Sequence, residues 1–62
     1  MSAADRINKA RKMLSDARDE LEVAKLDLSS DDHEAVSEIG SEISEFRRTL
    51  GVIASRYEEA ER

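Results

Sequence analysis

The residues of this 62-residue chain that could do chemistry begin with one histidine set among acids. His33 lies between Asp31, Asp32 and Glu34, and imidazole with carboxylates could bind a divalent cation. Metal ligands need convergent spacing, such as two ligands four residues apart on a helix or a calcium loop with its glycine. Neither pattern is present, so we expect a solvated helix start, with no metal and no cofactor.

Catalytic residues cannot be assembled from the rest of the chain either. Glu34, Glu38, Glu42 and Glu45 follow one another closely, but no Glu-x-x-His pair accompanies them, as a di-iron helix bundle requires. A single histidine and the absence of cysteine leave no credible activated nucleophile. The sequence therefore predicts a protein that is not an enzyme and has no small-molecule substrate.

Three basic residues, Arg11, Arg18 and Lys25, recur every seven positions and form a possible nucleic-acid stripe. Evenly spaced cations on one helix could follow the phosphates of RNA. Against this interpretation, the net charge is −5 and no aromatic residue interrupts the stripe to stack on bases. The alternative is that these charges flank a coiled coil. Nucleic-acid binding thus stays a second hypothesis.

Two amphipathic helices must position these residues, because apolar side chains recur at alternating steps of three and four. In the first half, the large members of this heptad stripe alternate with alanine, whereas the second half has large members almost throughout. We predict that both stripes form the apolar contact of an oligomer, made by Ile7, Ala10, Leu14, Ala17, Leu21, Ala24, Leu28, Val36, Ile39, Ile43, Phe46, Leu50, Ile53 and Tyr57.

The only break between the stripes is Ser29 to Asp32, so we expect one domain over residues 1–62, with helices at about 3–28 and 32–60 and a turn at 29–32. Ser2 can cap the first helix, and Ser30 or Asp31 the second. Folding at this turn sets each alanine of the first helix against a large residue of the second, for example Ala17 against Phe46. The sequence therefore predicts an all-α fold, an antiparallel two-helix coiled-coil hairpin, and the alternative is one continuous helix.

A hairpin of this size is expected to need a partner chain. The chain is 40% charged, has only two aromatic residues, and lacks cysteine, so oligomerisation is the remaining way to stabilise it. The simplest solution is a homodimer that forms a four-helix bundle. Residues 31–45 carry acids and no lysine or arginine, whereas residues 6–12 carry bases and no acid. This distribution favours an antiparallel dimer, in which opposite charges meet.

In length, heptad layout and turn position, the whole chain resembles the Rop family of plasmid-encoded helical hairpins. The resemblance implies a homodimer that binds RNA, which would use the basic stripe. No residue motif is shared, so no functional residue is carried over from it.

The sequence predicts a non-enzymatic hairpin protein that self-associates and binds a macromolecular partner, most simply a protein, as a regulator, an adaptor or a phage or mobile-element inhibitor. Val23, Leu26 and Val52 lie off the stripes and are a possible partner patch. A structural subunit of a hetero-oligomeric helical assembly is a further alternative. No apolar run approaches membrane-spanning length, so we expect a cytoplasmic protein without membrane contact.

Overall fold

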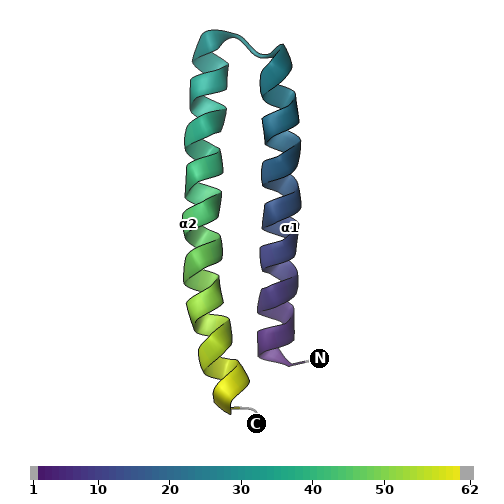
Figure 1. Cartoon of the computed structure of the whole chain (residues 1–62), viewed down its shortest axis with the longest axis vertical. Helices are drawn as coiled ribbons and strands as arrows, with labels where there is room; N and C mark the ends of the chain where they lie inside the picture. The colour runs from purple at the N-terminus through teal and green to yellow at the C-terminus, as the bar shows by residue number, and fades with distance from the viewer. Residues whose placement is uncertain (1, 61–62) are drawn as a thin grey trace.

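Two helices run antiparallel along almost the whole chain in the computed structural model, which describes residues 2–60 (Figure 1). Helix α1 spans Ala3–Ala24 and continues into a short 3₁₀ turn, η1, at Lys25–Asp27, and helix α2 spans Ser30–Ala60. The predicted antiparallel hairpin is confirmed. The described residues do not form one continuous rod, because the backbone of Leu28 is extended (φ −99°, ψ 154°).

Serine side chains begin both helices. The Ser2 hydroxyl accepts a hydrogen bond from the Asp5 amide at 3.1 Å, which confirms Ser2 as the cap of α1. At the second helix the cap is Ser29, because its hydroxyl accepts from the Asp32 amide at 3.4 Å and its carbonyl from the His33 amide at 2.8 Å. Capping of α2 by Ser30 or Asp31 is therefore wrong.

The connection between the helices is shorter than the expected turn at 29–32. The Leu28 amide donates to the Lys25 carbonyl at 3.2 Å, which closes the 3₁₀ turn, and α2 already begins at Ser30. A 3₁₀ turn at a helix end is a common way to satisfy carbonyls that have no partner further along the helix. Only Leu28 and Ser29 lie outside helical structure between Ala3 and Ala60.

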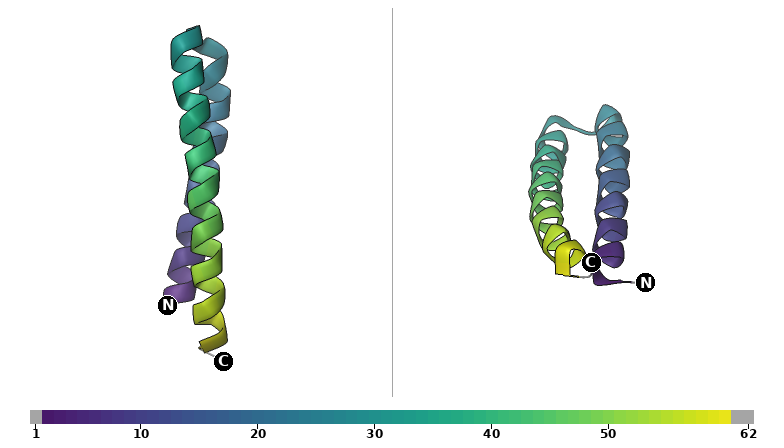
Figure 2. Two further views of the ribbon diagram at one scale, coloured as in Figure 1. Left: turned by 90° about the vertical axis from the view of Figure 1, so that its left-hand side faces the viewer. Right: turned by 60° about the horizontal axis from the view of Figure 1, so that its bottom comes forward.

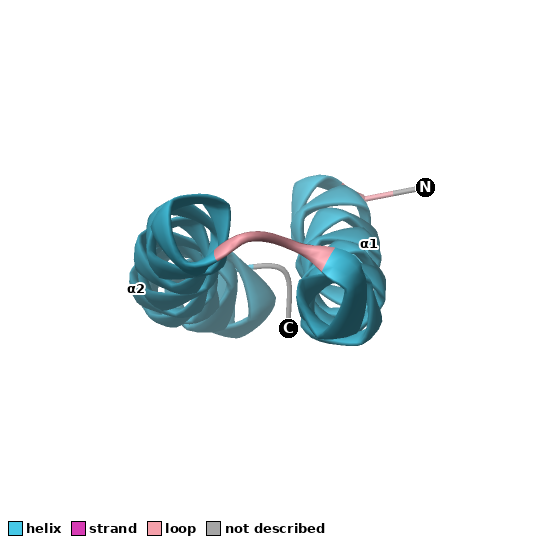
Figure 3. Cartoon of the chain, turned by 90° about the horizontal axis from the view of Figure 1, so that it is seen from above, coloured by secondary structure: helices cyan, strands magenta, loops and turns pink. Residues whose placement is uncertain are grey.

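The hairpin measures 48 × 17 × 9 Å. It is a single layer of two helices, as the side and end views show (Figures 2 and 3). Each helix therefore has one neighbour, whereas domains are generally built from two packed layers around a core. Ala4 and Ala54 are the only buried apolar residues among those described, and no large side chain is fully buried. The hairpin by itself has no hydrophobic core.

None of the helices in residues 2–60 is long and apolar enough to cross a membrane.

Candidate protein-interaction surface

Small and polar residues lie at the centre of the contact between α1 and α2, where Gly40 and Ala54 are buried and arginines donate hydrogen bonds across it. The Nε atom of Arg11 donates to the carbonyl of Arg47, and the Nε atom of Arg47 donates to the carbonyl of Arg11, each at 3.1 Å. Nearer the termini, the Asn8 amide donates to Glu58 at 2.8 Å and its oxygen accepts from Arg11 at 3.2 Å. These bonds tie the middle and the open end of the hairpin together.

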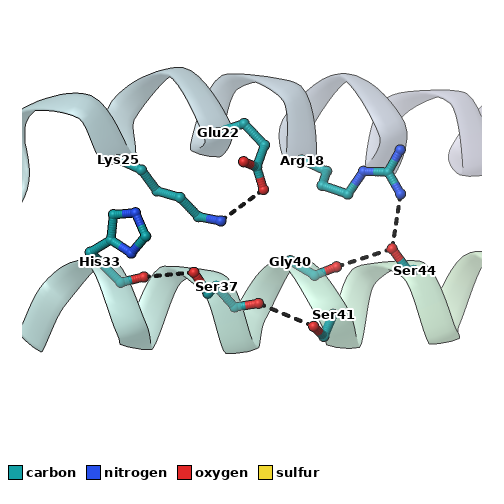
Figure 4. Close-up of polar contacts among 8 residues, drawn as sticks. All are labelled: Arg18, Glu22, Lys25, His33, Ser37, Gly40, Ser41 and Ser44. Atoms are coloured by element: carbon teal, nitrogen blue, oxygen red, sulfur yellow. Dashed lines mark hydrogen bonds and ion pairs between the residues drawn. The ribbon is translucent and has the colours of Figure 1, made fainter. Parts of the chain in front are cut away.

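A second group of polar contacts lies nearer the turn (Figure 4). Arg18 donates to the Ser44 hydroxyl at 2.8 Å, and Ser44 itself donates to the Gly40 carbonyl of its own helix at 3.2 Å. Lys25 forms an ion pair with Glu22 at 2.8 Å. The hydrogen bond that the Lys25 ammonium donates to the Glu22 carboxylate, together with the positive charge of Lys25, lowers the pKa of the Glu22 carboxyl below its ordinary value.

Both glycines of α2 face α1 at this contact. A Cβ atom at Gly51 would lie 3.1 Å from Cζ and Nη2 of Arg11, tighter than an ordinary van der Waals contact. A Cβ atom at Gly40 would meet Cγ of Arg18 at 3.9 Å and a carboxyl oxygen of Glu22 at 4.0 Å, which is ordinary packing distance. Gly51 therefore makes room for the Arg11 guanidinium, whereas the space at Gly40 would accept a methyl group.

The expected pairing of alanines with large residues inside the hairpin is wrong. Ala17 is exposed, and Phe46, its expected partner, keeps 55% of its surface exposed. The physical reason is that the residue after each of these, Arg18 or Arg47, faces the other helix instead. Small residues on α2 leave room there, and the long arginines of α1 lie against them.

The two heptad stripes consequently lie on the same side of the hairpin. In both helices the stripe residue precedes the facing residue by one position, and the helices run in opposite directions, so both stripes turn toward one face. We name this surface the apolar face and define it by the fourteen residues of the predicted oligomer contact. Its large members are partly buried or exposed; Tyr57 and Ile39 keep 50% and 46% of their surface exposed.

The opposite face of the hairpin is mostly polar and carries the possible partner patch. Val23, Leu26 and Val52 are 64%, 85% and 58% exposed. Val23 and Leu26 lie together at the turn end. Gly51 lies against Arg11. Val52, the next residue, is therefore level with the part of α1 around Arg11 and far from Val23 and Leu26. The structure thus divides the predicted patch into a pair and a single valine.

The basic stripe is part of the contact within the hairpin. Arg11 and Arg18 are partly buried and donate hydrogen bonds to α2, and Lys25 is paired with Glu22. Their cationic groups bond to other groups of the same chain rather than forming a separate exposed row.

The residues considered for chemistry do not converge. In the described part of the chain, no group of three or more histidine, cysteine, aspartate or glutamate side chains is placed to hold a metal ion. An open hollow of about 510 Å³ lies between the helices near the turn, lined by Arg18, Asp19, Glu22, Lys25, Ser37, Gly40, Ser41 and Ser44. The hydroxyls of its three serines donate to carbonyls one turn earlier, at 2.9 to 3.2 Å (Figure 4).

No family model, no curated protein and no solved structure matches this chain. The interpretation of its surfaces therefore depends on the geometry alone. The largest feature of that geometry is the apolar face, which no other part of the described chain covers.

Proposed function

We propose that this chain is a non-enzymatic helical-hairpin protein that self-associates through its apolar face and acts by binding another protein. The supporting observation is that two apolar helical stripes, one of large residues alternating with alanine and one of large residues throughout, lie on one face without a second layer. Contiguous apolar surfaces on small proteins mark protein-binding sites. A second copy of the hairpin supplies an equal face, and two such layers make a four-helix bundle.

The regulatory or adaptor role follows from the surface left free by this association. Val23 and Leu26 lie at the turn end of the opposite face, where a bundle formed through the apolar face leaves them accessible. Two adjacent exposed aliphatic side chains are a suitable anchor for a protein partner. The contacts of Arg11 and Arg18 within the hairpin do not favour RNA as that partner.

Self-association is tested with two aspartate substitutions in α2. Phe46→Asp places a charge on the apolar face, and Val52→Asp places the same charge on the opposite face at a position of nearly equal exposure, 58% against 55%. We expect multi-angle light scattering to give a dimer for the wild type and for Val52→Asp, and a monomer of low helicity for Phe46→Asp. A wild-type chain that is a stable helical monomer would overturn the proposal. A poorly helical wild-type monomer would instead favour a hetero-oligomeric assembly.

Partner binding is tested on the dimer with Val23→Asp combined with Leu26→Asp. We expect this double variant to remain dimeric and to lose proteins that the wild type retains in a pull-down from its source. The matched control is Val52→Asp, which should retain them. Identical captures by all three forms would reject the turn-end pair as the partner site.

A further inference from the structure

The outer edges of the apolar face carry an ordered set of residues. The residue after each stripe position faces the neighbouring helix, so the residue before every second stripe position, counted from Ile7 on α1 and from Val36 on α2, lies on the edge away from that helix. The residues before the intervening stripe positions, such as Val23 and Val52, turn further round, onto the opposite face. We name these positions the outer flanks. They are Arg6, Met13, Glu20 and Asp27 beside α1 and its 3₁₀ turn, and Ala35, Glu42, Thr49 and Arg56 on α2.

All eight outer-flank residues are exposed, and none of their side chains makes a hydrogen bond or ion pair with another described residue. In a four-helix bundle, such edge positions meet the helix of the second copy. Their charges are therefore free to decide how two hairpins are oriented.

The charges are symmetric about one level of the hairpin. On α1, Arg6 lies seven residues before Met13 and Glu20 lies seven residues after it. On α2, Glu42 lies seven residues before Thr49 and Arg56 seven after. A two-fold axis beside Met13 and Thr49 therefore exchanges an acid with a base on both helices.

A single two-fold axis perpendicular to the helices can pass beside both Met13 and Thr49 only if these two residues lie at the same height along the hairpin. Arg11 bonds the carbonyl of Arg47 and lies against Gly51, so its height on α2 is close to position 49. Met13 is two residues further along α1, which at 1.5 Å per residue is about 3 Å. The register observed inside the hairpin therefore meets this requirement to within about 3 Å.

Resting on the proposed self-association, we propose that a second copy covers the apolar face in an antiparallel arrangement whose two-fold axis passes beside Met13 and Thr49. In this dimer, α1 lies on α1 of the second copy and α2 on α2. Arg6 meets Glu20 of the second copy, and Glu42 meets Arg56 of the second copy, each twice by symmetry.

The apolar layers agree with this axis. Leu14 meets Ala10 of the second copy and Ile7 meets Ala17 of the second copy, so the alternation of large and small residues on α1 interlocks between copies. Phe46 meets Leu50 of the second copy on the other side of the bundle. The complementarity that is absent inside the hairpin is supplied between two hairpins.

A parallel dimer gives the opposite charge pattern. An axis along the bundle places α1 over α2 of the second copy at equal height, which sets Arg6 against Arg56 and Glu20 against Glu42. Symmetry fixes this register, so sliding cannot relieve the four like-charged pairs. Like charges that face each other across an interface oppose association.

Cysteine cross-linking distinguishes the two arrangements, because the natural chain has no cysteine. In the antiparallel dimer, Met13→Cys alone and Thr49→Cys alone each bring two thiols together at the axis, so each variant is expected to form disulfide-linked dimers on mild oxidation. In a parallel dimer neither does so alone, and only a mixture of the two variants forms a mixed disulfide. Lys12→Cys, on the opposite face beside Met13, is the negative control.

Charge reversal gives an independent result. Glu20→Arg places a second guanidinium against Arg6 of the second copy, so we expect the dissociation constant to rise about tenfold, and Arg6→Glu in the same chain should restore it. A parallel dimer would instead tighten with Glu20→Arg. Cross-linking only in the mixture, or a dimer that tightens, overturns the antiparallel axis while self-association stands. A chain that is monomeric at every concentration overturns both.

Discussion

The apolar face and the contact between the helices run side by side along the same two helices but have opposite composition. The contact consists mainly of glycine, alanine, serine and arginine, with Asn8 and Glu58 at the open end, and its hydrogen bonds are all formed within one chain. The apolar face consists of leucine, isoleucine, valine, alanine and aromatic residues, which are partly buried or exposed, and no second layer of the described chain lies over it. The hairpin thus has polar contacts between its helices and leaves much of its hydrophobic surface exposed.

This difference predicts where the stability of the folded protein resides. Polar contacts at a partly exposed surface contribute little net free energy, whereas burial of large aliphatic side chains contributes about 1.5–3 kcal/mol each. Most of the stabilisation should therefore appear only when the apolar face is covered. The substitutions below separate the two surfaces.

The largest effect is expected from matched leucine truncations. Leu50→Ala removes a partly buried side chain of the apolar face, and we expect it to lower the free energy of unfolding by about 2–4 kcal/mol. Leu26→Ala, at a side chain that is 85% exposed, should change it by less than about 0.5 kcal/mol. Urea unfolding followed by circular dichroism measures both. Equal, small effects would mean that the apolar face is not covered.

A smaller loss is expected at the inter-helix contact. Arg47→Met keeps much of the side-chain length but removes the guanidinium that donates to the Arg11 carbonyl, and we expect a loss of about 1 kcal/mol. The adjacent Arg48→Met, at an exposed position, is the control and should be nearly neutral. The same unfolding experiment compares them. A loss at Arg48 as large as that at Arg47 would contradict the assignment of Arg47 to the contact.

The two glycines should respond differently to a methyl group. Gly40→Ala fits at ordinary packing distance and is expected to raise the free energy of unfolding by up to about 1 kcal/mol, because alanine favours the helix. Gly51→Ala should gain less, since its Cβ atom would press on the Arg11 guanidinium at 3.1 Å. Adding Arg11→Ala removes that contact. If the difference between the glycines persists in that background, crowding by Arg11 is not its cause.

The smallest effect is expected from the ion pair near the turn. Because Lys25 lowers the pKa of Glu22 in the folded protein, the pair stabilises the fold above the ordinary glutamate pKa of about 4.3 and loses this effect as the pH falls through the lower folded value. Glu22→Gln should therefore differ slightly from the wild type at neutral pH and converge with it in acid. Thermal unfolding across this range tests the sign. Glu45→Gln, which is exposed and outside the contact, should show no such convergence.

The heptad pattern was sufficient to predict the helices and the hairpin, because spacing determines which side chains share a helical face. It could not determine how each helix is rotated toward its neighbour. The sequence does contain a signal for that rotation, since Gly40, Ser44, Gly51 and Ala54 line one side of α2 and could be expected to accept a neighbouring helix. For the arginines opposite them, spacing alone predicts an exposed stripe, because it does not show that Arg11 donates to a carbonyl of α2 and Arg18 to a hydroxyl of α2.

The position of the turn was predictable only approximately. Ser29, Ser30 and Asp31 are all good cap residues, and the choice among them depends on where the first helix tightens into its 3₁₀ turn. The separation of Val52 from Val23 and Leu26 depends on the register between the helices. The register implied by setting Ala17 against Phe46 is close to the observed one, in which Arg18 bonds Ser44, so this separation was within reach of the sequence.

The central claim is that folding of this chain depends on a covering layer made by another copy. The most direct test is the thermal unfolding midpoint of the wild type, followed by circular dichroism over a hundredfold range of protein concentration. If folding and association are coupled, mass action requires the midpoint to rise steadily with concentration. A midpoint that stays constant over this range, with full helicity at the lowest concentration, would contradict the claim.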